Sequence, residues 1–290
     1  MDTTPLNWRT LTASVRGAAH ERSGLPNQDA IRVARLDAGR ALLVALADGH
    51  GSAKSFRSQP GARLAVATAY WAVRALFDSA RPPSLKRWAE DRLPVELVRG
   101  WQARVNNRLQ RYPFTPTELD GLDVAARQQL EQHPLVAYGS TLLTVLITPS
   151  FILYIQLGDG DILVVNADGE VERPFPRDPR LIANETTSLC SPHAWNEVRV
   201  RFQTLAGAPP ALILAATDGY ANAFRDESGF QQAARDYWTL LRDGGESAVQ
   251  PHLTEWLNEA SRLGSGDDVS LGLIWRDSTR EPHIPKIVHE

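Results

Sequence analysis

The sequence predicts an α+β fold in which antiparallel sheets are flanked by helices. Three observations lead to this prediction. Short apolar runs bounded by turn-forming residues indicate buried strands, and tight turns join neighbouring runs as in hairpins. Segments with helical periodicity are grouped between and after the strands instead of alternating with each strand, which favours an α+β architecture over a parallel α/β one.

The N-terminal part of the chain reads as three strands and then a helical region. The strands are expected at residues 11–19, 30–36 and 41–47, and Asp37-Ala38-Gly39 is typical of a hairpin loop between the last two. Apolar residues then recur at helical spacing over 61–77 and 94–109, with Pro82-Pro83 between them. A third helix is expected at about 117–132, opened by Thr117 and Asp120 as a variant capping box. We predict that these helices cover a sheet, and that residues 79–133 form a helical insertion.

The C-terminal part repeats this grouping of elements. Residues 172–197 are rich in Pro, Ser, Thr and Asn, which predicts a surface flap, and residues 277–290 are expected to form a tail. A turn is expected at Asn166–Gly169. The remaining segments predict strands at 138–147, 151–158, 161–171, 211–217 and 267–275, and helices at 229–242 and 247–263.

Composition narrows the classes of function. The 290 residues carry a formal charge of −3 and scattered arginines, so no nucleic-acid partner is expected. Cys190 is the only cysteine, which excludes an intrachain disulfide, a thiolate zinc site and an iron–sulfur cluster. No segment approaches the ~18 apolar residues that span a bilayer, and the N-terminus does not resemble a signal peptide. We therefore expect a cytoplasmic protein without a membrane partner.

Four apolar runs meet an aspartate at their ends. These aspartates are Asp48, Asp159, Asp218 and Asp267. A single Asp-Gly after a strand usually marks only a turn, and Asp168-Gly169 is read in that way. Four such ends favour a shared site, because clustered carboxylates repel one another unless a cation neutralises them. An all-oxygen ligand set suits Mg²⁺ or Mn²⁺, so the pattern predicts a metal-dependent hydrolase.

Six motifs in a fixed order give this chain a family resemblance. They are NQDA (27–30), ADGHGS (47–52), YGST (138–141), LGDGDIL (157–163), TDGY (217–220) and GDDVS (266–270). In this order the chain resembles the metal-dependent serine/threonine phosphatases of the protein phosphatase 2C type, over about residues 11–275. The resemblance implies a four-layer α-β-β-α sandwich of two antiparallel sheets flanked by helices, built as a single domain over residues 1–276.

The resemblance also implies metal-binding roles. Asp48 would bridge two metal ions, with the carbonyl of Gly49 as a further ligand. Asp218 and Asp267 would hold the first ion, and Asp29 would support the second, in a motif where many relatives have Glu-Asp and this chain has Gln28-Asp29. Asp159, together with Asp218, would be the candidate ligand of a third, weaker ion.

The implied reaction is phosphomonoester hydrolysis by direct attack of a metal-bridging hydroxide. His50 would protonate the departing serine or threonine alkoxide, a role that suits a histidine titrating near neutral pH. Many relatives grip the substrate phosphate with an arginine where this chain has Gly24. His20 and Arg22 are the candidates to replace that arginine here, with Lys54 and Arg57 as alternatives.

The expected function is a phosphoserine/phosphothreonine protein phosphatase that acts in signalling, with a phosphorylated protein as substrate and a cognate Ser/Thr kinase as its counterpart. Two alternatives stay open from the sequence. One is a catalytically weak module that binds phosphoproteins, which Gln28 and Gly24 suggest. The other is a phosphatase of a small phosphorylated metabolite, because a metal centre contacts only the phosphate group.

Overall fold

Strand β3 (Ala41–Ala47) shows why the apolar runs are continuous. All seven residues are buried. Leu42, Val44 and Leu46 pack in one hydrophobic cluster while Leu43 and Ala45 pack in another, because side chains alternate between the two faces of a strand. A strand covered on both faces has no polar positions, and this accounts for the uninterrupted runs in the sequence. The computed structural model describes residues 7–78, 84–176 and 187–276.

Within these residues the strands form two five-stranded sheets with antiparallel pairing throughout. The first sheet has the order β1-β10-β9-β6-β7, with bounds Trp8–Val15, Val269–Arg276, Leu212–Ala216, Asp161–Val165 and Val171–Glu172. The second has the order β2-β3-β4-β5-β8, in which the strands other than β3 span Ala30–Leu36, Leu142–Ile147, Phe151–Leu157 and Arg199–Thr204.

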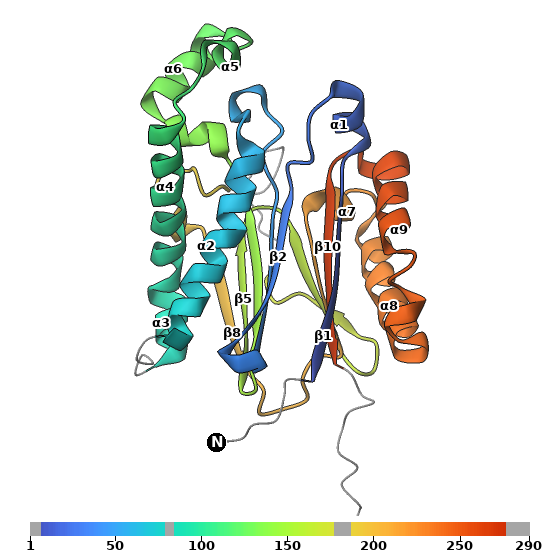
Figure 1. Ribbon diagram of the computed structural model, residues 1–290. Coiled ribbons are helices and arrows are strands. Elements are labelled where there is room, and N and C mark those ends of the chain that lie inside the picture. The colour runs from blue at the N-terminus through green and yellow to red at the C-terminus, as the bar shows by residue number, and fades with distance from the viewer. Residues whose placement is uncertain (1–6, 79–83, 177–186, 277–290) are drawn as a thin grey trace, which may run out of the picture.

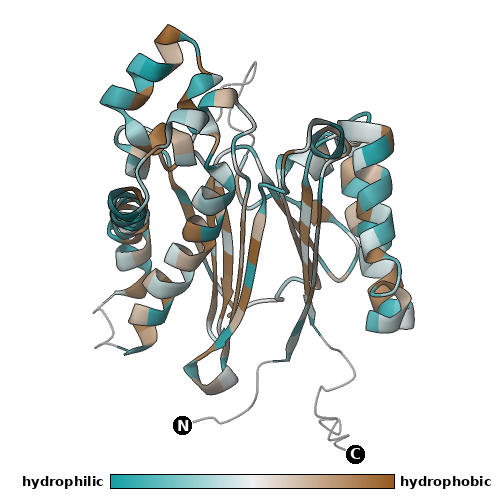
Figure 2. Cartoon of the chain, turned by 45° about the horizontal axis from the view of Figure 1, so that its top comes forward, coloured by the Kyte–Doolittle hydropathy of each residue, from teal (hydrophilic) through white to brown (hydrophobic). Residues whose placement is uncertain are grey.

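Helices cover the outer face of each sheet (Figure 1). Helices α2 (Ser58–Asp78) and α4 (Leu93–Arg111) pack on the second sheet, and the buried Trp101 of α4 donates a hydrogen bond from Nε1 to the carbonyl of Gly61 in α2 at 3.0 Å. Helices α8 (Glu227–Gly244) and α9 (Leu253–Ala260) pack on the first sheet. A separate apolar cluster fills the space between the sheets. In Figure 2 the strands are largely brown, the colour of hydrophobic residues. The predicted four-layer sandwich is confirmed.

Several local predictions need correction. The strand expected at 11–19 ends at Val15, because the short helix α1 (Ala18–Ser23) begins three residues later. The helix expected at 117–132 is two helices, α5 (Pro116–Asp120) and α6 (Val124–Gln132). Its capping box is formed by Thr115 and Glu118, two residues earlier than predicted.

Some elements had no clear signal in the sequence. These are the edge strand β8, helix α3 (Leu85–Asp91) and the single turn α7 (Asp218–Ala221). The helix expected at 247–263 begins at Leu253 as α9 and continues as a π-helical turn over Ser261–Ser265. The hairpin loop at Asp37–Gly39 is confirmed.

This structure does not test the proposed domain boundaries. Part of the predicted flap, residues 177–186, and all of the predicted tail at 277–290 lie outside the described residues. The single domain and the helical insertion stay predictions. In the described part of the chain, none of the helices has the length and apolar character that crossing a bilayer requires.

Candidate metal centre

Three of the predicted aspartates meet at one end of the sandwich. Asp48 follows β3, Asp159 follows β5, and Asp218 opens α7 directly after β9, so both sheets contribute. One carboxylate oxygen from each of the three lies within 4.8 Å of the others. We call these three residues the carboxylate cluster.

The backbone around Asp48 explains two of the motifs. The amide of Asp48 donates to Thr141 Oγ1 at 3.0 Å, and the amide of Thr141 donates to the carbonyl of Asp48 at 2.9 Å. The YGST motif therefore holds the end of β3 in place. A Cβ atom on Gly49 would lie 2.7 Å from the carbonyl oxygen of Gln28 and 2.9 Å from the backbone of Ser58, so only glycine fits beside Asp48.

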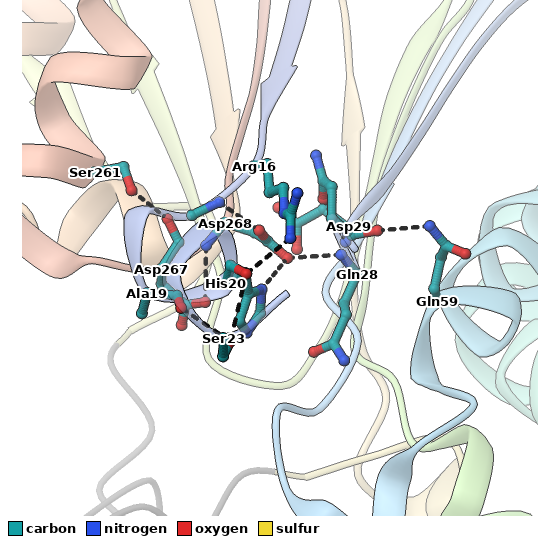
Figure 3. Close-up of polar contacts among 12 residues, drawn as sticks. Arg16, Ala19, His20, Ser23, Gln28, Asp29, Gln59, Ser261, Asp267 and Asp268 are labelled. Carbon is teal, nitrogen blue, oxygen red and sulfur yellow. Dashed lines mark hydrogen bonds and ion pairs between the residues drawn. The ribbon is translucent and has the colours of Figure 1, made fainter. Parts of the chain in front are cut away.

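A second acidic group lies at the start of β10, where His20, Asp267 and Asp268 approach one another within 4.8 Å (Figure 3). Asp268 is buried, and its carboxylate accepts hydrogen bonds from the amides of Gly17 and Gln28, both at 2.6 Å, and lies 2.9 Å from His20 Nδ1. Asp268 therefore ties three segments together. The side chain of Asp267, by contrast, accepts one hydrogen bond among the described residues, from the amide of Asp268 at 2.8 Å.

Asp29 and Gln28 lie buried at the start of β2. Asp29 Oδ2 accepts a hydrogen bond from Thr217 Oγ1 at 2.8 Å. In the part of the chain that the structure describes, Asp29 Oδ1, Gln28 Oε1 and Asp218 Oδ1 are buried without a hydrogen-bond partner. Buried polar atoms normally have one, so these three oxygens point to a ligand.

The electrostatics of the aspartates lead to the same conclusion. Burial, together with the charges of Asp29, Asp218 and Asp267, raises the pKa of Asp48 well above its usual value. Burial also raises the pKa of Asp29 to about 8 and that of Asp218 to about 6, with contributions from neighbouring carboxylates. The protein thus holds more carboxylates here than it can keep ionised without a cation.

These residues fit divalent metal ions. The donors are all oxygen atoms, they converge from both sheets, and several lack any other partner. Hard cations such as Mg²⁺ and Mn²⁺ prefer such ligands. Of the predicted ligands, the structure brings Asp48, Asp159 and Asp218 into one cluster, and it places Asp29 and Asp267 close enough for their charges to raise the pKa of Asp48.

His50 lies next to this centre, with its ring turned toward Ser188. Its Nε2 lies 2.8 Å from Ser188 Oγ, and its ring packs so closely on Gly139 that a Cβ there would come within 2.7 Å. Burial lowers the pKa of His50, and Lys54 lowers it further against the opposing effect of Asp159. The neutral imidazole is therefore favoured in the folded protein.

The candidate phosphate-binding side chains differ in their exposure and in the hydrogen bonds that they already make. Arg22 is exposed on α1, and His20 is held by Asp268 with only 12% of its side chain exposed. Arg57 is excluded as a free cation, because its guanidinium donates to Glu118, to Tyr138 Oη and to two backbone carbonyls. Arg57, one of the alternatives from the sequence, is thus already engaged by other partners.

Three polar residues with structural roles at the site were not singled out from the sequence. Ser188 contacts His50, Thr217 contacts Asp29, and Thr141 contacts Asp48. Thr141 and Thr217 lie within motifs that were noted for other residues. Ser188 comes from the predicted flap, where no pattern pointed to it.

Comparison with known proteins agrees with this fold. Residues 16–258 match the family model described as Protein phosphatase 2C. A search of curated protein sequences finds no match. Among solved structures, the serine/threonine phosphatase PstP/Ppp of Mycobacterium tuberculosis superposes with a TM-score of 0.56 at 16% identity, covering 93% of this chain and 99% of that one.

Other solved structures give similar values. Stp1 from Staphylococcus aureus has a TM-score of 0.57 at 14% identity and covers 94% and 96% of the two chains. The catalytic domain of the serine/threonine phosphatase PstP, crystallised with two manganese ions, has a TM-score of 0.54 at 18% identity and covers 92% and 97%. Because the family model spans most of the sequence and the sandwich matches these folds, this chain belongs to the protein phosphatase 2C family.

Proposed function

We propose that this protein is a divalent-metal-dependent phosphoserine/phosphothreonine protein phosphatase. The observation that carries the proposal is the carboxylate cluster, in which half-buried aspartates from both sheets converge, and where Asp218 Oδ1 and the nearby Asp29 Oδ1 have no hydrogen-bond partner among the described residues. Asp48, Asp218 and Asp267, with Asp29 and the carbonyl of Gly49, would hold two Mg²⁺ or Mn²⁺ ions, and Asp159 would contribute to a third. When bound, such ions activate water for attack on phosphorus and offset the charge of the phosphoryl oxygens.

The chain's own residues would manage the leaving group and the phosphate. His50 donates a proton to the departing alkoxide in this proposal. Burial favours its neutral form, and the negative charge of a phosphate monoester bound nearby acts in the opposite direction and favours protonation. His20, whose Nδ1 is held by Asp268, and Arg22 are the groups that we assign to the substrate phosphate.

Ser188 orients His50. Its hydroxyl lies 3.1 Å from the carbonyl of Ser140 and accepts from the amide of Ser140 at 3.1 Å. The contacts are satisfied when the hydroxyl donates to that carbonyl and His50 Nε2–H donates to the hydroxyl. The predicted flap would thereby fix the histidine ring.

The first experiment is hydrolysis of para-nitrophenyl phosphate and of a phosphoserine peptide with Mn²⁺, with Mg²⁺ and with EDTA. Asp218→Asn is the test variant. Asp168→Asn is the matched control, because Asp168 also precedes a glycine but lies exposed in a turn between β6 and β7. We expect metal-dependent turnover that Asp218→Asn abolishes and Asp168→Asn leaves intact. Folded, metal-loaded protein without turnover on either substrate would refute the proposal and favour a phosphoprotein-binding module.

The substrate is proposed to be a phosphorylated protein in a signalling pathway with a cognate Ser/Thr kinase, and the location is proposed to be the cytoplasm. Turnover of the small substrate combined with none of any phosphopeptide would instead favour a phosphorylated metabolite. The assignment of a protein substrate rests on the family membership and on a groove that opens beside the site.

A further inference from the structure

A groove of 490 Å³ opens beside the metal centre. Its near end is lined by Gln28 and Gly51, which are the chain neighbours of Asp29 and His50. Its far end is lined by Arg108, Tyr112 and Glu118, from the end of α4 and from α5. We call it the insertion groove. Its volume lies within the range of about 300–1,000 Å³ that is typical of ligand sites.

The far wall of the groove is built rigidly. Arg57 Nε and Nη2 donate to the two carboxylate oxygens of Glu118 at 2.6 and 2.7 Å, and its remaining donors reach Tyr138 Oη and the carbonyls of Tyr112 and Pro113. Bidentate pairs of this kind fix geometry as well as charge. The guanidinium beside Glu118 lowers the pKa of that carboxyl to about 2, so the pair stays ionised and neutral overall.

The charge that remains in the groove is positive. Arg108 is exposed, and its guanidinium lies 5.4 Å from the ring centroid of Tyr112. Among the described residues, Arg108 forms no salt bridge with a carboxylate. Tyr112 is 60% exposed, and Phe56 and Pro60 add apolar surface.

The elements that shape this groove lie at the end of the molecule that carries the site. In Figure 1, α5 and α6 stand at the same end as α1, above α2 and α4. Figure 3 shows the side chain of Gln28 extending away from Asp268, while its backbone amide stays bound to that carboxylate. The groove is therefore continuous with the residues that adjoin the carboxylate cluster.

We propose that the insertion groove binds the polypeptide segment next to the phosphorylated residue of the substrate, with an acidic side chain of that segment paired to Arg108. Charge complementarity and continuity with the candidate site select this occupant. The proposal rests on the proposed phosphatase function and adds to it a preference for acidic residues flanking the phosphorylated one. Tyr112 would contribute apolar contact to the aliphatic part of the same segment.

The test is a charge swap. Phosphoserine peptides carry glutamate, or lysine, in turn at each position flanking the phosphoserine, and kcat/KM is measured for the wild type and for Arg108→Glu. We expect one register in which the glutamate peptide is preferred by the wild type and loses about tenfold in Arg108→Glu, while the lysine peptide gains. Turnover of para-nitrophenyl phosphate should not change, because that substrate does not reach the groove.

Two further variants separate this binding mode from general effects. Arg111→Glu is the matched control, since Arg111 is exposed on the last turn of the same helix but does not line the groove. Tyr112→Ala removes the aromatic side chain while the Tyr112 carbonyl that Arg57 requires remains. It should lower kcat/KM for peptides in every register, again without affecting the small substrate.

Each outcome decides the proposal. Equal loss for glutamate and lysine peptides would overturn it, because that result would reflect a general loss of activity. An equal effect of Arg111→Glu would also overturn it, because that result would reflect only net charge. Wild-type protein that hydrolyses nothing would refute the proposed function by itself. In that case fluorescence anisotropy measures the binding of the same phosphopeptides, carrying a fluorescent label. If Arg108→Glu did not weaken binding of the glutamate peptide and strengthen binding of the lysine peptide, the groove assignment would be refuted as well.

Discussion

Asp218→Asn should have opposite effects on the stability of the protein with and without metal. In metal-free protein the substitution removes one carboxylate from a cluster whose oxygens approach within 4.8 Å. With metal it removes a ligand. The same change should therefore stabilise the protein in EDTA and reduce its stabilisation by Mn²⁺.

The magnitude follows from the charge of Asp218. Its pKa in the folded protein is about 6, raised from an ordinary value of 3.8. A difference of this size corresponds to about 3 kcal/mol of unfavourable free energy once the group is ionised in both states. Burial of the carboxylate contributes most to this penalty, and the charges of Asp159 and Asp267 add to it.

The effect of Asp218 on the free energy of unfolding depends on pH. Below the unfolded value both states are protonated, and Asp218 contributes nothing to the free energy of unfolding. Between 3.8 and about 6 the native state keeps a proton that the unfolded chain has released, so stability falls as pH rises. Above about 6 the penalty is complete. Asp218→Asn should thus stabilise the metal-free protein at pH 8 and have little effect at pH 4.

The assay is thermal unfolding in EDTA and in Mn²⁺ at both pH values. A gain of about 3 kcal/mol raises the midpoint by about 5 °C for a chain of 290 residues. Mn²⁺ at ~100 times its Kd should stabilise the wild type by about 2.7 kcal/mol, and the variant by much less. A variant that is destabilised in EDTA at pH 8, or one that keeps the full Mn²⁺ shift, would refute the reasoning; Asp168→Asn should change neither.

Three further predictions concern the contacts around the site. Asp268→Ala leaves the amides of Gly17 and Gln28 without an acceptor, so the free energy of unfolding should fall by about 2–4 kcal/mol in denaturant titrations, and no change would contradict the role of Asp268 as a tie between segments. Arg57→Ala should cost about 1–2 kcal/mol, because the pair with Glu118 is partly exposed, and should raise hydrogen exchange in α5 while leaving α9 unchanged. Ser188→Ala should lower kcat on a phosphoserine peptide more than on para-nitrophenyl phosphate, whose leaving group needs little protonation; an equal loss on both would indicate a structural effect alone.

The sequence predicted most of the fold because burial leaves a local record. Strands such as β3 and β5 are covered on both faces, so their residues are almost all apolar, and such a run can be recognised in the sequence. Strand β8 was missed because it lacks this two-sided burial. It is an edge strand whose positions are half-buried or exposed, and its pairing with β5 is specified by the neighbouring strand instead of by its own composition.

Candidate ligands could also be identified from the sequence, because Asp48, Asp159, Asp218 and Asp267 each lie next to a buried apolar run. The sequence by itself determined the sandwich and the set of acidic residues. Only the tertiary structure decided their partners: His20 is 248 residues from Asp268, and His50 is 138 residues from Ser188. It also showed that Arg57 is fully occupied by Glu118 and nearby carbonyls and that Arg108 forms no salt bridge among the described residues. Local periodicity reports which face of an element is buried, whereas the identity of a contact depends on how distant segments pack.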